Sequence, residues 1–202
     1  SMPDPPMQLL SAFAQGLAKA GMKPTSFNYI TEGVDTANYQ SLYTYLSPTL
    51  DSINYWFMKK SINFYGETLL KTIAYEKTGF GSTEKGLEIV KQFWKERGID
   101  PAGLRMIDGS GLSPQNHITV DALVKVLQYA HTRPWFPYYY DALPVYNNMK
   151  LKSGTTGAVK GFAGYLKAKE GTTYTVALLI NNYSGSTNDI VKKMFVVLDE
   201  LK

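Results

Sequence analysis

Hydrophobic side chains recur at every third or fourth position along much of the first two thirds of this chain, and this spacing predicts helices. The first helix is expected over residues 7–20, and Gly21 is expected to end it. Its apolar positions are Leu9, Leu10, Phe13, Leu17 and Ala20. Further helices are expected over residues 47–60, 64–76, 82–96 and 119–130.

Residue types that cap helices mark the starts of three of these segments. Ser47 is expected to be an N-cap, with Pro48 in the first helical position. Ser82 is expected to open a later helix, which Gly98 stops. Thr119 is expected to cap the helix that follows. These signals set the helix boundaries more firmly than the hydrophobic spacing alone.

The last third of the chain has the pattern of strands. Strands are expected over residues 149–153, 161–168 and 173–180, with a hairpin turn at Glu170-Gly171. Shorter strands are expected at 42–46 and 104–108, and residues 135–140 are expected to be irregular or short-helical. A final amphipathic helix is expected over 187–201, with Ile190, Met194, Val197 and Leu198 on its apolar face. This order predicts an α+β fold in which helices pack on an antiparallel sheet.

Composition is that of an ordinary globular protein and predicts one domain over residues 1–202. The net charge of +4 is mild, and the lysines occur singly or in pairs such as Lys59-Lys60 and Lys192-Lys193. This scatter favours a solvated surface over nucleic-acid binding. With no cysteine, disulfides and thiolate chemistry are excluded, and His117 and His131 do not have a metal-ligand spacing. We therefore expect neither a metal nor a cofactor.

The apolar runs are too short to predict a transmembrane segment, which needs roughly 20 residues. No signal peptide is present either. The chain begins Ser1-Met2-Pro3-Asp4, which is typical of a tag remnant, here Ser1, placed before an internal start. The missing signal is therefore expected to reflect how the chain was cut.

Three short patterns could carry chemistry. They are Ser61-Ile62-Asn63 between two helices, the loop 108–113 and Lys152-Ser153-Gly154 near the end of a strand. Taken alone, the first is typical of a helix cap and the third of a surface turn. The glycine-rich loop lacks the spacing of a phosphate-binding loop. Together, however, a Ser-x-Asn followed 91 positions later by a Lys-Ser-Gly matches two motifs of serine β-lactamases and penicillin-binding proteins.

Longer phrases carry a more specific resemblance. The segments SPTLDSINYWFMKKSINFYGETLLKTI, MIDGSGLSPQNHIT and LKSGTTGAVKGFAGYL resemble the D-alanyl-D-alanine carboxypeptidase/endopeptidase family of the penicillin-binding protein 4 (DacB) type, peptidase family S13. The resemblance runs from about residue 5 to residue 202. It implies part of a β-lactamase/transpeptidase-like fold that lacks its N-terminal portion.

The resemblance also implies a role for each matching residue. An upstream serine would attack a D-alanyl peptide bond, and Ser61 would relay a proton toward the leaving amine. Asn63 would bind a substrate amide or orient the lysine next to the nucleophile. Lys152 would supply a positive charge that lowers the pKa values of its neighbours and draws in the substrate carboxylate.

The substrate-binding residues implied by the resemblance follow Lys152 along the chain. Ser153 would hydrogen-bond the substrate carboxylate, and Gly154 and Thr155 belong to the same segment. The backbone N–H of Thr156 would form one half of an oxyanion hole, worth roughly 2.7–4 kcal/mol. Leu112 would give the site an apolar wall. For the loop around Leu112, a tight turn fixed by its glycines is an equally good reading.

The sequence departs from the family pattern at three positions. Ile62 stands where an aspartate is typical, Ser153 replaces a threonine, and Pro114 stands where the family often has arginine. Ile62 is expected to have a small effect because the middle residue of the motif points away from the site. Ser153 keeps the hydroxyl, whereas the proline leaves substrate contacts at that position open.

The family's nucleophile motif, Ser-x-x-Lys, should precede Ser61, and residues 1–60 contain none. The one match, Ser82-Thr83-Glu84-Lys85, follows Ser61 and reads as a helix N-cap. Because loss of a catalytic serine costs on the order of 10⁶ in rate, we expect this chain alone to be inactive and not to be acylated by penicillin. The exposed strand edge of such a fragment predicts a homodimer.

The implied function is a fragment of an exported serine D-Ala-D-Ala carboxypeptidase or endopeptidase. Its partners would be peptidoglycan stem peptides and β-lactams, in the periplasm or another extracytoplasmic compartment. Two alternatives stay open, a non-catalytic module that binds cell-wall peptides and an unrelated α+β scaffold with chance motifs. A large separation between Ser61 and Lys152 would favour the last of these.

Overall fold

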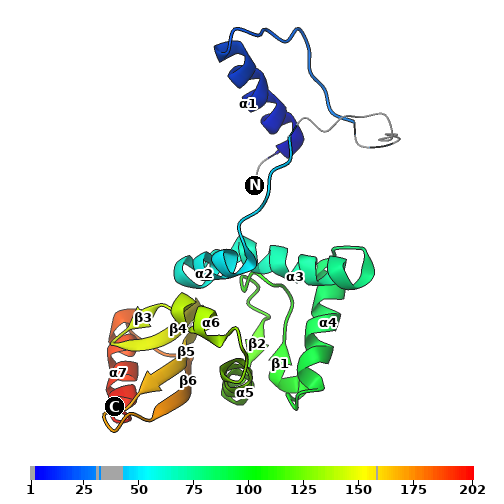
Figure 1. Cartoon of the computed structure of the whole chain (residues 1–202). Coiled ribbons are helices and arrows are strands. Elements are labelled where there is room, and N and C mark those ends of the chain that lie inside the picture. Colours follow the sequence, from blue (N-terminus) through cyan, green and yellow to red (C-terminus); the bar gives the residue numbers. More distant parts are fainter. Residues whose placement is uncertain (1–2, 31, 33–42, 158) are drawn as a thin grey trace. The chain divides into compact units, whose positions relative to one another are not determined.

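The computed structural model of the chain describes residues 3–30, 32, 43–157 and 159–202 (Figure 1). The chain divides into two compact units, Ser1–Leu46 and Ser47–Lys202. The first contains helix α1 (Pro5–Lys19), and the second contains all the other elements. Ser1 and Leu42, on which two of the expectations above bear, lie outside the described residues.

In the first unit, the predicted helix is confirmed and begins two residues earlier than expected. The Asp4 carboxylate accepts a hydrogen bond of 3.0 Å from the Met7 backbone N–H, and Pro5 follows the cap. Gly21 has a φ of +82° just after the helix, which is the left-handed conformation that glycine adopts at helix ends. The expected strand at 42–46 is wrong for its described part, because residues 43–46 have no regular structure. Within the described chain they pair with no strand.

The second unit begins with three consecutive helices. They are α2 (Leu50–Lys60), α3 (Asn63–Thr78) and α4 (Thr83–Lys95). The predicted N-cap at Ser47 is wrong, since α2 begins later and Thr49 holds the extended cap conformation. Ser82 caps α4 as predicted, with its hydroxyl accepting from the backbone N–H of Lys85. Thr119 likewise caps α5 (Val120–His131).

A four-stranded antiparallel sheet follows, in the order β3-β4-β5-β6. Its strands are β3 (Val145–Tyr146), β4 (Met149–Thr156), β5 (Val159–Lys167) and β6 (Thr173–Asn181). In the β4–β5 register, Leu151 lies opposite Gly164 and Lys152 opposite Ala163. The turn before β6 is confirmed, with Gly171 at a φ of +93°. The short strand β3 was not expected from the sequence.

Four short elements of the described structure also precede the sheet in the second unit. The strand expected at 104–108 is shorter than predicted, and its two residues, β1 (Leu104–Arg105), pair with β2 (His117–Ile118). A 3₁₀ turn, η1 (Pro101–Gly103), precedes it. The aromatic stretch at 135–140 is helical as α6 (Phe136–Ala142).

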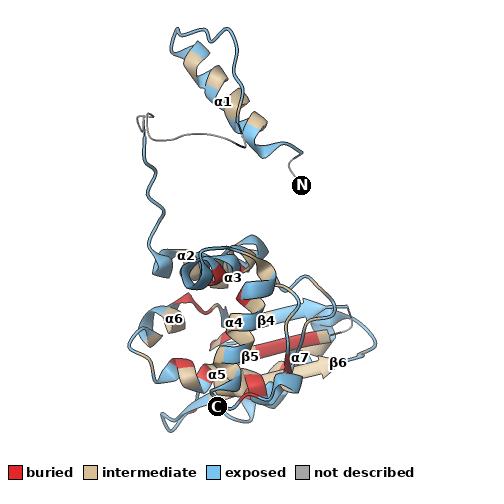
Figure 2. Cartoon of the chain, turned by 90° about the vertical axis from the view of Figure 1, so that its right-hand side faces the viewer, coloured by how far each residue is buried: buried red, intermediate tan, exposed pale blue. Residues whose placement is uncertain are grey.

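Different helices pack on the two faces of the sheet. Helix α7 (Thr187–Asp199) packs on one face, and the buried side chains there are Met149, Leu151, Phe162, Leu166, Val176, Met194 and Leu198. Helices α5 and α6 pack on the other, around Tyr165, whose hydroxyl donates to the Leu127 carbonyl at 2.7 Å. Figure 2 shows that buried residues run along β5. Of the residues assigned to the apolar face of α7, Val197 is 58% exposed and lies at its margin.

No helix in the described parts of the chain combines the length and the apolar character that crossing a bilayer requires.

Candidate functional site

Ser61 forms the junction between α2 and α3. It is the C-cap of α2 and has a φ of +54° and a ψ of +48°, the left-handed conformation. A residue other than glycine adopts this conformation at a cost of roughly 1–2 kcal/mol. The chain therefore turns sharply at Ser61 and leaves its side chain exposed at the end of a helix. Backbone strain of this kind is concentrated at functional sites.

The end of α2 is anchored to the segment that leads into the sheet. The ammonium of Lys59 donates a hydrogen bond of 2.9 Å to the Leu143 carbonyl, and Leu143 is completely buried. Lys150, on β4, reaches the same carbonyl at 3.5 Å. Because Leu143 lies just before β3 and β4, this contact fixes the helix end relative to the sheet.

Lys152 extends from β4 toward that helix end. Its ammonium lies 2.6 Å from the Ser61 hydroxyl and 3.3 Å from the carbonyl of Ser153. Burial lowers the pKa of Lys152, and the positive charge of Lys160 lowers it further. The two residues singled out in separate motifs are thus in direct contact. This is the arrangement whose absence would have favoured an unrelated scaffold.

The residues after Lys152 line a cavity of about 580 Å³. Ser153, Gly154, Thr155 and Thr156 all contribute to its wall. Parts of β5, β6, η1, α5 and the segment from Gly111 to Thr119 line the rest. The Ser153 hydroxyl lies 3.2 Å from the Tyr146 hydroxyl. The Leu151 N–H donates to the Pro144 carbonyl at 3.0 Å, and beyond it β4 pairs only with β5 within the described structure. Its other backbone edge can therefore receive an extended ligand.

The loop 108–113 is organised around one carboxylate. Asp108 accepts hydrogen bonds from the backbone N–H groups of Gly111 and Ser113, at 2.6 and 2.9 Å. The Ser110 hydroxyl and the Asn116 side-chain amide also donate to it. Partial burial raises the pKa of Asp108, but these four hydrogen bonds outweigh it and hold the pKa below its usual value. The tight-turn reading therefore describes the geometry of this loop.

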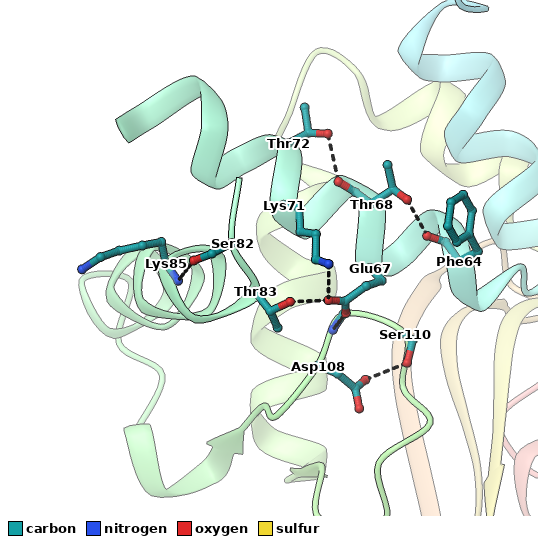
Figure 3. Close-up of polar contacts among 11 residues, drawn as sticks. Phe64, Glu67, Thr68, Lys71, Thr72, Ser82, Thr83, Lys85, Asp108 and Ser110 are labelled. Carbon is teal, nitrogen blue, oxygen red and sulfur yellow. Dashed lines mark hydrogen bonds and ion pairs between the residues drawn. The ribbon is translucent and has the colours of Figure 1, made fainter. Parts of the chain in front are cut away.

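Glu67 holds the loop against the helices (Figure 3). One carboxylate oxygen accepts a hydrogen bond of 2.8 Å from the backbone N–H of Gly109. The other accepts a hydrogen bond from the Thr83 hydroxyl at the start of α4. Lys71, one turn along α3, lies 3.9 Å from the same oxygen. Glu67 thus joins three elements, α3, α4 and the loop, at one point.

Two glycines allow the loop to approach α3 this closely. A Cβ at Gly66 would lie 2.2 Å from the carbonyl oxygen of Gly109. A Cβ at Gly109 would lie 2.6 Å from the carbonyl oxygen of Gly66. Both contacts are with backbone atoms, which cannot move aside. The loop therefore lies directly on the helix that begins next to Ser61.

Two of the expected site residues have fewer contacts. Asn63 is the first residue of α3 and is exposed, and its side chain makes no hydrogen bond with the described residues. Leu112 is 67% exposed and does not line the cavity, whereas Gly111 and Pro114 do. The apolar wall expected from Leu112 is therefore not part of this cavity as it stands.

The Ser-x-x-Lys at Ser82 lies away from this site. Ser82 is used as the helix cap (Figure 3). The Lys85 ammonium pairs with Glu88 at 2.7 Å on an exposed face. The 16 residues of α3, about 24 Å of helix, separate Ser82 from Ser61. Across the described chain, no cluster of three or more potential metal ligands was found.

Neither Lys160 nor Glu67 was predicted from the sequence, and both belong to the surroundings of the site. Lys160 is only 8% exposed, although it carries a charge. A lysine within the apolar pattern of β5 was a usable signal, since charged side chains are seldom buried without a partner. Glu67 gave no such signal, because a glutamate on a helix is ordinarily a surface residue.

Comparison with known proteins gives a consistent result. The model of the D-Ala-D-Ala carboxypeptidase 3 (S13) family matches residues 1–147. The D-alanyl-D-alanine carboxypeptidase of an Actinomadura species is 32% identical over 172 residues, which cover 75% of this chain and 32% of that protein. The chain spans about a third of the length of the curated relatives it matches.

Solved structures show the same fold at lower sequence identity. Penicillin binding protein 4 (dacB) from Haemophilus influenzae, complexed with a beta-lactam, matches with a TM-score of 0.79 and 22% identity over 96% of this chain and 50% of that chain. The TLA-3 extended-spectrum beta-lactamase matches with a TM-score of 0.55 and 14% identity over 73% of this chain and 61% of that chain. The α+β fold of the β-lactamase/transpeptidase-like kind is thereby confirmed.

Proposed function

Because this chain belongs to the D-Ala-D-Ala carboxypeptidase 3 (S13) family, we propose that it carries part of the active site of a serine-type D-Ala-D-Ala carboxypeptidase or endopeptidase. The substrates would be peptidoglycan stem peptides, cleaved through an acyl-enzyme that penicillin mimics. Residues 1–202 would be the C-terminal part of the penicillin-binding domain. The observation that supports this proposal is the 2.6 Å contact between Lys152 and Ser61 beside the strand-lined cavity.

The contact suits a proton relay. A lysine ammonium carries three donors and no acceptor, so Ser61 accepts from Lys152 and keeps its own hydroxyl proton available to donate. Ser61 can therefore pass a proton to a leaving amine and be reprotonated from its neighbours. The lowered pKa of Lys152 eases the exchange of that proton. Asn63, exposed at the start of α3, would bind the substrate amide or orient a second lysine.

The strand edge suits the binding of a peptide end. In the proposal, the positive charge of Lys152 attracts the terminal carboxylate, and Ser153 donates its hydroxyl to it. Gly154 and Thr155 line the path of the peptide along β4, and the Thr156 N–H would stabilise the developing oxyanion. Leu112, at the exposed tip of its loop, would contact the stem peptide outside the cavity. Such a substrate places the reaction outside the cytoplasm, in the periplasm or another extracytoplasmic compartment.

The nucleophile would come from sequence other than these 202 residues. The one Ser-x-x-Lys in the chain is occupied by helix capping at Ser82. We propose that the 202-residue chain binds stem-peptide ends without cleaving them, and forms no covalent adduct with penicillin. No cofactor is required for this chemistry.

The proposal is tested with the 202-residue chain and two ligands. We expect N-acetyl-D-Ala-D-Ala to shift the NMR amide signals of Gly154, Thr155 and Thr156, and N-acetyl-L-Ala-L-Ala to shift them much less. The Lys152→Met variant should lose the response. Lys167→Met, at the exposed end of β5, is the matched control and should keep it.

Two outcomes would contradict the proposal. Equal binding of the two stereoisomers would refute the D-Ala-D-Ala assignment. A labelled penicillin that attached covalently to the chain, detected by intact mass, would refute the absence of a nucleophile.

We also propose that the chain forms a homodimer through the outer edge of β6. Within the described structure, β6 pairs on one side only, with β5. Its sequence, Thr173–Asn181, contains no charged residue and no proline, the residue types that protect edge strands from pairing.

A further inference from the structure

Lys160 is a buried lysine whose position in the fold invites an explanation. It lies on β5 directly opposite Thr155 of β4, and its side chain is 8% exposed. Its ammonium donates a hydrogen bond of 2.9 Å to the Thr155 hydroxyl and lies 4.9 Å from the centre of the Phe162 ring. These are the contacts the structure gives this ammonium within the described residues.

No carboxylate pairs with Lys160 in the described parts of the chain, where each ion pair involves another lysine or arginine. A buried charge without an opposite charge is costly, and a protein gains stability by replacing it with an apolar side chain. Hydrogen bonding to one hydroxyl and contact with one ring offset only part of that cost. The retention of a lysine here points to a function that needs the charge.

Lys160 and Lys152 approach the same stretch of β4 from opposite faces of the sheet. Successive residues of a strand point to alternate faces, so Lys152 and Thr155, three positions apart, point in opposite directions. Lys152 contacts Ser61 on one side, and Lys160 contacts Thr155 on the other. The two positive charges therefore lie on either side of the segment Ser153–Thr155, which lines the cavity.

The hydrogen bond also sets what the Thr155 hydroxyl can do. Because its oxygen accepts from an ammonium, its own proton points elsewhere, and a neighbouring positive charge makes it a stronger donor. A hydroxyl oriented in this way at a cavity wall is suited to an anionic oxygen. The field of Lys160 reaches the same place without contacting the ligand.

We propose that Lys160 is the second cation of a carboxylate-binding subsite on β4, and that it acts as a positioning residue through the Thr155 hydroxyl. The ligand is the terminal carboxylate of a peptide, which accepts from the hydroxyls of Ser153 and Thr155 on one face of β4, while Lys152 attracts it from the other face. The proposal rests on the function proposed above for its substrate, and it adds a residue and a charge to that site.

The test compares N-acetyl-D-Ala-D-Ala with its C-terminal amide on the 202-residue chain. We expect the wild-type chain to prefer the free carboxylate, and Lys160→Met to reduce that preference about tenfold, as expected for the loss of a nearby charge. Lys160→Arg should retain the preference, and the control Lys167→Met should leave it unchanged. Urea unfolding should show Lys160→Met to be at least as stable as the wild type, since burial of a charge is relieved.

The stability measurement separates the subsite from a merely structural role. If Lys160→Met were less stable and lost binding of the carboxylate and the amide equally, the lysine would be structural and the inference wrong. An unchanged preference for the carboxylate in a folded Lys160→Met would also overturn it. So would a wild-type chain that binds neither peptide.

The same experiment distinguishes this inference from the proposed function. A Lys160-dependent preference for carboxylates that is equal for D-Ala-D-Ala and L-Ala-L-Ala would support the subsite and refute the peptidase substrate. A preference for the D stereoisomer that does not depend on Lys160 would support the substrate and refute the subsite.

Discussion

The ammonium of Lys152 lies 2.6 Å from the hydroxyl of Ser61, although one belongs to a strand and the other to the end of a helix 91 positions earlier. Neither element positions both groups by itself. The contact depends on the anchor between Lys59 and the Leu143 carbonyl, and on the left-handed turn at Ser61. The chemistry at this point is thus a product of tertiary packing.

Ser61 should be less favourable for stability than glycine. Ser61→Gly removes the steric cost of the left-handed conformation, roughly 1–2 kcal/mol, but also loses the hydrogen bond to Lys152, about 0.5–1.5 kcal/mol. We therefore expect the free energy of unfolding to rise by about 0.5 kcal/mol. Ser61→Ala keeps the steric cost and loses the hydrogen bond, so its free energy of unfolding should fall by about 0.5–1.5 kcal/mol. Urea titration of the three proteins measures both differences. A glycine variant less stable than wild type would mean that the hydroxyl contact outweighs the backbone strain.

Asp108 should make the stability of the chain sensitive to acid. Its folded-state pKa lies below the unfolded value of about 3.9, so the unfolded chain binds the proton more readily. Its contribution to stability is therefore fully present above about pH 5 and is lost as the pH falls through the folded pKa. Asp108→Asn lacks this contribution at every pH. The stability difference between wild type and variant should shrink below about pH 4 in a series of urea titrations.

The matched control for this comparison is Asp121→Asn. Asp121 lies in the first turn of α5 and pairs with Lys125 on an exposed surface. Exposed pairs of this kind contribute little to stability. An acid dependence of the same size in both variants would show that the Asp108 hydrogen bonds have no special effect.

The contact between Gly66 and Gly109 should tolerate no side chain. Gly66→Ala or Gly109→Ala would place a methyl group against backbone, and we expect each to cost about 2–4 kcal/mol. Gly154→Ala is the control, because a Cβ there meets nothing within 4 Å. Thermal and urea unfolding measure the costs. Equal stability of all three variants would show that the loop can leave α3 freely.

Dimer formation should depend on the edge of β6. Tyr174, 40% exposed on this strand, can be replaced by lysine, whose charge opposes pairing with another strand. Sedimentation velocity should show a concentration-dependent dimer for wild type and a monomer for Tyr174→Lys. Val196→Lys, on the exposed side of α7, removes a comparable apolar side chain elsewhere and should still dimerise. A wild-type chain that stays monomeric at high concentration would refute the proposal.

Much of the fold could be predicted because local signals agree with the tertiary structure. Ser82 and Thr119 cap their helices as their residue types indicate, and Gly171 forms the turn before β6. Ser47 did not cap α2, since several polar residues precede that helix and local sequence cannot choose among them. The strand β3 has only two residues, too few to show a period of hydrophobic positions.

The site was predictable only as far as its motifs. Ser61 and Lys152 were singled out by residue type and order, and the structure brings them into contact. Glu67 could not be found in this way, because its role depends on the nearness of Gly109, which lies 42 positions away. Leu112 was placed by analogy with the family, whereas in this chain Gly111 and Pro114 line the cavity.

The pairing of β4 with β5 has a consequence for misfolding. Gly164 lies opposite Leu151, and a Cβ at Gly164 would lie 2.1 Å from the Lys150 carbonyl oxygen, so this glycine admits the neighbouring backbone at one alignment. A slip by one residue would turn Leu151 toward Ser61 and drive Lys152 into the apolar layer under α7. A misaligned pair of strands would thus lose both the hydrophobic core under α7 and the contact between Lys152 and Ser61. Correct packing of that core therefore ensures that Lys152 lies next to Ser61.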